Sequence, residues 1–185
     1  MSKSKLKNSK ISDMIYIAIS VALMAICAWI SIPAPVPFTL QTFGVFVTVG
    51  ILGGKRGSLA ILIYLLLGLI GVPVFSGFGG GIQALLGATG GYIIGFLLSA
   101  LAMWGMEKLL GKKTWALALS MVLGLLVCYA FGTIWFMVVY ARPTGAIGLW
   151  TALGWCVFPY IIPDLAKIVL ALMLSKRLAA VLKLR

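Results

Sequence analysis

An acidic and a basic residue, Asp164 and Lys167, lie in a long apolar run of a 185-residue chain that has three acidic residues and no histidine. Residues three apart on a helix share one face, so the two side chains can form an ion pair. Pro163, just before them, is typical of the first turn of a helix. Ionisable groups in a membrane segment are costly and usually mark a binding site or a pathway. Apolar residues would stabilise a helix at least as well, so we favour a binding role over simple mutual neutralisation.

The sequence lacks the residues that catalysis or metal binding would need. No second carboxylate, histidine or activated nucleophile is expected near the acid. The three cysteines stand in separate apolar runs, without the spacing of a metal site or a redox pair. The glycine and lysine segments at residues 53–56 and 111–114 do not have the GxxxxGK[ST] spacing of a phosphate loop. We therefore expect no enzyme activity, no metal and no cofactor.

The composition indicates an integral membrane protein, because 63% of the residues are hydrophobic and only 10% are charged. One helix that crosses the hydrocarbon needs roughly 20 apolar residues, which leaves room for about six crossings. We therefore expect an all-α bundle in which residues 1–185 form a single transmembrane domain. The six predicted spans are residues 11–30, 38–53, 58–71, 91–106, 114–140 and 152–174.

The second and third runs are short, and a re-entrant hairpin there would leave only four crossings. That hairpin would place Lys55 and Arg56 in the hydrocarbon, at about 2.5–3.5 kcal/mol each. With six crossings, all of the 15 basic residues except Arg142 and Lys167 lie on one side, as the positive-inside rule requires. We therefore expect both termini in the cytoplasm. Basic residues in short clusters between spans, not on one face, argue against nucleic acid as a partner.

A proline-rich turn opens the second run and brings two polar side chains to its outer end. Pro35 and Pro37 enforce an extended backbone, which places Thr39 and Gln41 near the start of the helix. The free N–H groups of a helix start can bind an anion or a carbonyl. Thr39 can also serve only as a cap, whereas the amide of Gln41 needs partners, and we include both in the predicted site.

A long, uncharged, glycine-rich connection, residues 72–90, is expected on the outside before the fourth run. Such a segment fits a lid or a simple connector. Gly90 and Gly91 allow a ligand or a neighbouring helix to come close. Tyr92 offers a ring and a hydroxyl at the interface, where tyrosine is also a common anchor, and Phe75 can supply an aromatic wall.

These features converge on the outer half of the membrane. Counted back from Lys176 at about 1.5 Å per residue, Asp164 lies in that half. An acid–base pair, polar helix starts and a glycine-rich cap describe a pocket with a few polar groups in apolar surroundings. No polar track continues inward, as a channel would require. The sequence therefore predicts a binding site for a compact amphiphile, open to the outside.

Four motifs carry a resemblance to a known family. They are PVPFTLQ at residues 35–41, GVPVF at 71–75, GATGGY at 87–92, and a segment that runs from Pro159 to DLAK at 164–167. With these motifs in order over nearly the whole chain, the sequence resembles the biotin-specific S components of energy-coupling factor (ECF) transporters, the BioY family. Two departures from the family pattern are visible. Ala88 replaces a usual proline, and Ile162-Pro163 replaces a Pro-Gly step, but neither change removes a predicted ligand side chain.

The resemblance implies a six-helix S component of the bacterial plasma membrane that binds biotin on the outside. It also implies partners, a transmembrane coupling protein and two cytoplasmic ATPases, that drive delivery inward. In this family an A-x-x-x-A motif on the first helix contacts the coupling protein, and Ala18 and Ala22 match it. Small residues four apart also allow close packing within one bundle, which stays an alternative.

Biotin suits the predicted site. Its ureido ring offers N–H donors and a carbonyl, so Asp164 can accept a hydrogen bond while Lys167 donates one. The carboxylate would then lie nearer Gln41, Thr39 or loop N–H groups. The reverse placement, with Lys167 on the carboxylate, stays open. Other readings are an S component for another vitamin, such as riboflavin or thiamine, and a membrane channel or structural protein without a small-molecule ligand.

Overall fold

The computed structural model describes residues 3–34, 36–145 and 147–182, so predictions that concern Pro35, Lys183 and Arg185 lie outside the described residues. The elements in chain order are α1 (Lys3–Trp29), β1 (Ser31–Ile32), β2 (Phe38–Thr39), α2 (Gln41–Leu52), α3 (Gly54–Leu69), the 3-10 helix η1 (Ser76–Phe78), α4 (Ile82–Leu86), α5 (Gly90–Leu110), α6 (Thr114–Thr144), α7 (Leu149–Cys156) and α8 (Phe158–Leu182). Apart from one short antiparallel hairpin, β1 with β2, the described chain is helical, as the sequence predicts.

Each of the six predicted apolar runs contains a helix, but the helices differ in length. Among the described residues, four segments are long and apolar enough to cross a membrane: Ile11–Trp29, Gly90–Leu110, Thr114–Tyr140 and Phe158–Leu178. The helices α2 and α3 have 12 and 16 residues, and the sixth run is broken at Val157 into α7 and α8. The all-α membrane class is confirmed, whereas six crossings and their orientation stay predictions.

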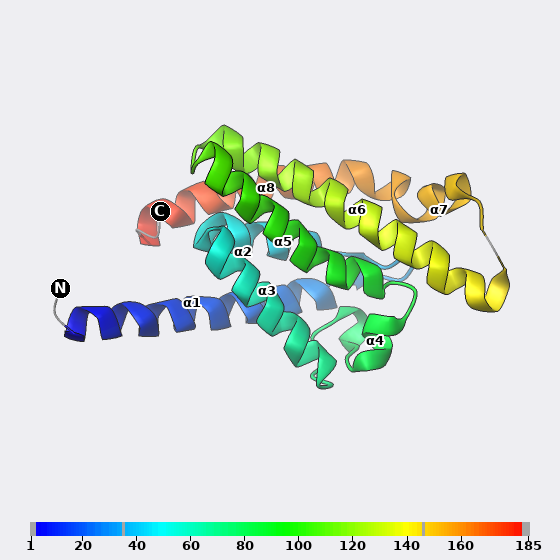
Figure 1. Cartoon of the computed structure of the whole chain (residues 1–185), viewed down its shortest axis with the longest axis horizontal. Helices are drawn as coiled ribbons and strands as arrows, with labels where there is room; N and C mark the ends of the chain where they lie inside the picture. Colours follow the sequence, from blue (N-terminus) through cyan, green and yellow to red (C-terminus); the bar gives the residue numbers. More distant parts are fainter. Residues whose placement is uncertain (1–2, 35, 146, 183–185) are drawn as a thin grey trace.

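The helices lie side by side, and the chain reverses at two ends of the bundle (Figure 1). Both termini, the α2–α3 corner and the α5–α6 turn lie at one end, which we name the inner end after the predicted orientation. The β1–β2 hairpin, α4 and the α6–α7 connection lie at the other, the outer end. The glycine-rich connection that the sequence predicts is folded, since it contains η1 and α4.

The helices α5 and α6 pack against one another through glycine. A Cβ atom on Gly91 would lie 2.2 Å from Cβ of Trp135, and one on Gly132 would lie 2.2 Å from the ring of Tyr92. Lipid tails are as apolar as leucine, so membrane helices associate through such close contact and not through apolar burial alone. The glycines therefore fix how near α6 approaches α5, and with it the position of the side chains between them.

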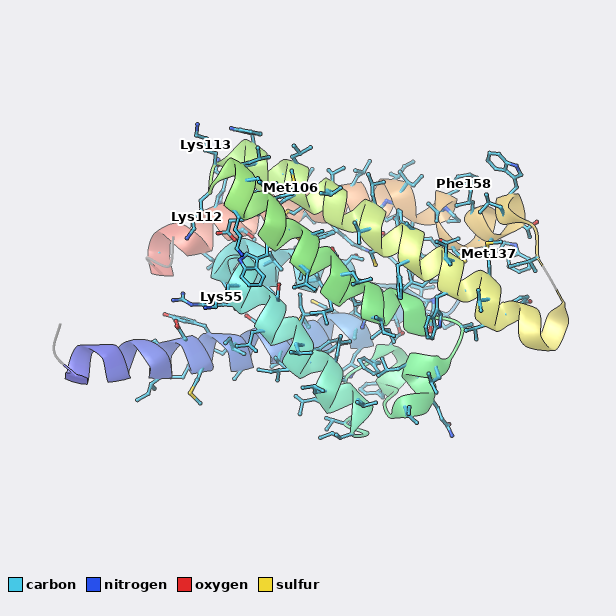
Figure 2. All side chains as sticks on the ribbon, viewed as in Figure 1. Lys55, Met106, Lys112, Lys113, Met137 and Phe158 are labelled. Carbon is cyan, nitrogen blue, oxygen red and sulfur yellow. The ribbon has the colours of Figure 1, made fainter. Side chains whose placement is uncertain are left out.

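Charged side chains gather at the inner end, where Figure 2 shows Lys55, Lys112 and Lys113 near the α2–α3 corner and the α5–α6 turn. Gly53, with φ of +78°, is the single residue between α2 and α3. The N–H of Gly54 then donates to the carboxylate of Glu107, which places an anion at the start of α3. This charge distribution agrees with an interface at the inner end.

One local prediction is wrong. Pro163 lies inside α8 and not in its first turn, because α8 already begins at Phe158. The N–H of Tyr160 donates to the carbonyl of Val157 (2.9 Å) and so starts the helix before the proline. Proline has no N–H for the carbonyl four residues earlier, which here is that of Pro159. A proline just before Asp164 thus removes one backbone hydrogen bond within the helix.

Candidate functional site

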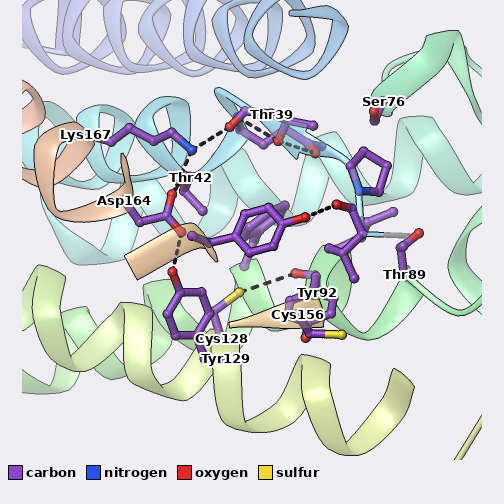
Figure 3. A pocket seen from close by; sticks show the side chains of 16 residues that line it. Thr39, Thr42, Ser76, Thr89, Tyr92, Cys128, Tyr129, Cys156, Asp164 and Lys167 are labelled. Atoms are coloured by element: carbon purple, nitrogen blue, oxygen red, sulfur yellow. Dashed lines mark hydrogen bonds and ion pairs between the residues drawn. The ribbon is translucent and has the colours of Figure 1, made fainter. Parts of the chain in front are cut away.

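A pocket at the outer end contains about 610 Å³ of atom-free space, counting the solvent at its mouth. Its lining combines side chains from α2, α5, α6, α7 and α8 with the β1–β2 connection and the segment around η1 (Figure 3). Five of the predicted ligand residues line it: Thr39, Gln41, Tyr92, Asp164 and Lys167. Residues more than 120 positions apart in the sequence therefore meet at one site.

The predicted ion pair is formed and buried. Lys167 Nζ lies 2.7 Å from Asp164 Oδ1, and the two side chains are 7% and 4% exposed. Lys167 also donates to the backbone carbonyl of Thr39 (2.7 Å) and lies 4.2 Å from the ring centroid of Phe38. The ammonium is thus surrounded by a carboxylate, a carbonyl dipole and an aromatic face, each of which stabilises a buried cation.

Two hydroxyl groups complete the surroundings of the carboxylate. Thr42 donates to Asp164 Oδ1 (3.0 Å), and Tyr129 donates to Oδ2 (2.6 Å). With Lys167, the carboxylate therefore accepts three hydrogen bonds from described residues. A carboxylate offers roughly four acceptor positions and an ammonium three N–H groups. By this count, one acceptor position on Oδ2 and one N–H of Lys167 have no hydrogen-bond partner among the described residues, and both side chains line the pocket.

The predicted ligand residues did not include five hydroxyl-bearing residues of the pocket lining: Thr42, Ser76, Thr89, Tyr129 and Tyr160. Thr42 directly follows Gln41, and this adjacency is a signal that could have found it. Tyr129 is one of several hydroxyl-bearing residues in the apolar run of α6, and only its register toward α8 reveals its role. The hydroxyl of Tyr160 donates to the carbonyl of Val36 and thereby ties α8 to the connection before α2.

Gln41 lies in a buried hydrogen-bond path that leaves the pocket. Its Nε2 donates to the hydroxyl of Tyr64 (2.7 Å), which in turn donates to the carbonyl of Val74 (2.8 Å). On the other side, Thr39 donates to Oε1 of Gln41 (3.3 Å) and accepts from its backbone N–H (3.2 Å). Thr39 therefore satisfies the first N–H of α2 and also lines the pocket, and ligand contact by it stays a prediction.

Tyr92 lines the pocket while its hydroxyl is paired with Thr133 (2.9 Å). Cys128 and Cys156, also in the lining, are buried free thiols. They add apolar surface, as expected of isolated cysteines in a membrane bundle. Within the described residues, no three His, Cys, Asp or Glu side chains are close enough to ligate a metal ion.

The structure places three predicted ligand residues outside the pocket lining. Phe75 is 1% exposed, and its ring fills the space above Gly68, where a Cβ atom would come within 2.0 Å of it. A Cβ atom on Gly90 would lie 1.8 Å from the carbonyl oxygen of Leu85, and Gly91 faces α6 as described above. All three shape the backbone near the pocket, and direct ligand contact by them stays a prediction.

Ala18 and Ala22, the predicted partner residues, are both exposed on α1. Large apolar side chains around them are exposed as well, with Ile15 at 52% and Ile19 at 60%. The alternative that these alanines pack inside the bundle is therefore wrong. This face of α1 is available to lipid or to another membrane protein.

Known proteins resemble this chain in sequence and in fold. The chain matches the BioY family over residues 1–184. It is 42% identical over 169 residues to the biotin transporter BioY of Thermotoga maritima, covering 90% of this chain and 95% of that protein. It is 41% identical over 170 residues to the probable biotin transporter BioY of Pyrococcus horikoshii, covering 91% and 97%.

The fold agrees with the sequence comparison. The crystal structure at 2.1 Å of the S-component for biotin from an ECF-type ABC transporter superposes with a TM-score of 0.84 at 28% identity. The match covers 97% of this chain and 95% of that chain, so it includes the outer pocket as well as the helices. With the family match over nearly its full length, the chain belongs to the BioY family.

Proposed function

We propose that this chain is the membrane-embedded S component of an ECF-type importer and that it binds biotin in the outer pocket. The observation that carries the proposal is the buried Asp164–Lys167 ion pair in the pocket lining, whose printed hydrogen bonds leave one acceptor position on Oδ2 and one N–H of Lys167 for a ligand. A cyclic urea presents a complementary N–H and carbonyl at similar spacing. Its binding would satisfy the remaining hydrogen-bond positions of both buried groups, which otherwise face the pocket unpaired.

The other end of the ligand points away from the ion pair. Ser76 and Thr89 lie across the pocket from Asp164 (Figure 3). Their hydroxyls can donate hydrogen bonds to the carboxylate of biotin. The second N–H of Gln41 Nε2 can bind the ligand between its ureido ring and its carboxylate. In the reverse placement the carboxylate of biotin would bind Lys167. Because Asp164 lies only one hydrogen-bond length from Lys167, the carboxylates of biotin and Asp164 would then lie side by side and repel each other. We therefore place the ureido ring at the ion pair.

Delivery to the inside requires partners, since the chain has no phosphate loop. A coupling protein and ATPases of an ECF module would supply ATP-driven release, with the exposed face of α1 at Ala18 and Ala22 as the contact with the coupling protein. The proposed topology has six crossings and cytoplasmic termini. Support comes from the α2–α3 corner, which lies at the inner end with both termini, and from Arg56, which pairs there with Asp13 (3.2 Å).

Two experiments test these proposals separately. Native mass spectrometry of the detergent-solubilised chain with biotin, riboflavin and thiamine is expected to show one bound biotin per chain and neither of the other vitamins. Preferred binding of another vitamin would contradict the assignment. For the topology, Lys55→Cys in whole cells should resist a membrane-impermeant thiol reagent, whereas Ser76→Cys should react. Labelling of both from outside would refute six crossings.

A further inference from the structure

A cap, defined here as residues 72–80, borders the outer pocket, and its Ser76 belongs to the pocket lining. Gly71 and Gly81 flank the cap with φ of +100° and +83°. Glycine adopts these angles without the steric clash that a Cβ atom would cause. The backbone on both sides of the cap is therefore permissive, and the position of the cap depends on the contacts that tie it to the helices.

The most deeply buried of these contacts comes from Tyr64 on α3. Its hydroxyl donates to the carbonyl of Val74 in the cap (2.8 Å), and its ring meets that of Phe75 edge to face at 5.5 Å. Phe75 fills the space above Gly68 on the same helix. Tyr64 is 1% exposed, so loss of its hydrogen bond would leave polar atoms without water to replace the partner.

The same hydroxyl also reaches the pocket wall, because it accepts a hydrogen bond from Gln41 Nε2 (2.7 Å). One buried group thus joins a pocket-lining amide to the cap. A second contact, from Trp29 to the carbonyl of Pro73 (2.8 Å), has no such link, and Trp29 is 39% exposed. Phe78 of the cap also stacks on Trp29 at 5.1 Å, and the Val72 N–H donates to the carbonyl of Leu67 (3.0 Å). Tyr64 differs from these contacts because it joins the cap to a residue of the pocket lining.

We propose that Tyr64, which does not line the pocket, is a positioning residue that sets how readily the cap opens. The inference rests on the proposed function of biotin binding. Opening the cap breaks the hydrogen bond between Tyr64 and Val74 whether or not ligand is present. Because the cap borders the pocket through Ser76, this opening widens the path of the ligand and sets the rates of both entry and exit, as in other sites where a loop closes over the ligand.

Tyr64→Phe removes the hydroxyl and keeps the ring. With tritium-labelled biotin and the purified full chain, we expect the association and dissociation rate constants both to rise about tenfold, the value of one buried hydrogen bond. The dissociation constant should then change by less than about threefold. A residue that contacts ligand, or one whose loss merely loosens the pocket, raises the dissociation rate constant alone.

Three further variants frame the result. Gln41→Ala, a change in the pocket wall itself, should raise mainly the dissociation rate constant. Ser120→Ala removes another buried hydroxyl hydrogen bond, to Leu117 in the inner half, and should change neither constant. Gly68→Ala displaces Phe75 without touching the hydroxyl, and we expect it to raise both constants. If Tyr64→Phe does not fold, the rate constants of Gly68→Ala test the role of the Tyr64 contact instead.

The outcomes separate this inference from the proposed function. Unchanged rate constants in both Tyr64→Phe and Gly68→Ala, or a rise in the dissociation rate constant alone, would overturn the role of Tyr64. Absence of biotin binding by the folded wild-type chain would instead overturn the proposed function on which the role rests.

Discussion

Replacing Asp164 by asparagine removes the charge that faces Lys167 while keeping the shape of the side chain. The carboxylate accepts from Lys167, Thr42 and Tyr129, and it is 3% exposed. Breaking a buried ion pair by neutralising one partner costs about 3–5 kcal/mol of folding stability. A charge-assisted hydrogen bond to the ligand is worth about 1.5–3 kcal/mol, so biotin affinity should fall by roughly 10- to 150-fold.

The assay compares Asp164→Asn with Asp13→Asn and Glu107→Gln, which change the other two acids of the chain. Both of those lie in contacts at the inner end, with Arg56 and with Gly54. Biotin affinity by equilibrium binding and thermal unfolding without ligand should be measured on all three. Equal, small losses of affinity in the three variants would refute the assignment of the site.

A double variant separates folding from ligand contact. Asp164→Leu combined with Lys167→Met removes the whole pair, so no unpaired charge stays buried and stability should recover toward that of the wild type. Biotin binding should still be lost, because neither the acceptor nor the donor is present. Binding by the double variant at wild-type affinity would show that the pair serves only the fold.

Three further changes address the rest of the site. Tyr129→Phe removes one donor to Asp164 and should weaken biotin about tenfold and also lower the thermal stability, because a charge-assisted hydrogen bond is lost; titration calorimetry with unchanged affinity would contradict this. Ala18→Trp with Ala22→Trp should abolish co-purification with the coupling protein and ATP-driven uptake while leaving biotin binding intact, and undisturbed assembly would place the partner surface elsewhere. Gly91→Leu, whose side chain must displace Trp135, should lower the unfolding temperature by several degrees, roughly 4 °C or more, and an unchanged temperature would refute the glycine packing.

The sequence predicts the ion pair because Asp164 and Lys167 are outliers in an apolar run, and their short separation alone places them on one helix face. Thr39 and Gln41 are predictable for a related reason, since the proline-rich turn fixes where α2 begins. These signals are local. They depend on polarity and on backbone chemistry within a few residues, which a sequence displays directly.

Tyr129 and Tyr64 are different, because their roles depend on which helix lies opposite them. A single tyrosine in an apolar run is typical of an interfacial anchor, and only the packing of α6 against α8 directs Tyr129 to Asp164. For Gly90 and Gly91, the sequence shows that close contact is possible but not with which group. Glycine before a helix permits close approach of a ligand or of a helix, and the structure shows contact with α4 and α6.

Calorimetric titration of the purified chain with biotin, and in parallel with octanoate, tests the central claim most directly. Octanoate has a carboxylate and an alkyl chain but no cyclic urea, so it has no N–H to donate to the free acceptor position of Asp164. We predict saturable binding of one biotin per chain and no detectable binding of octanoate. Failure of the folded chain to bind biotin, or equal affinity for both ligands, would contradict the account.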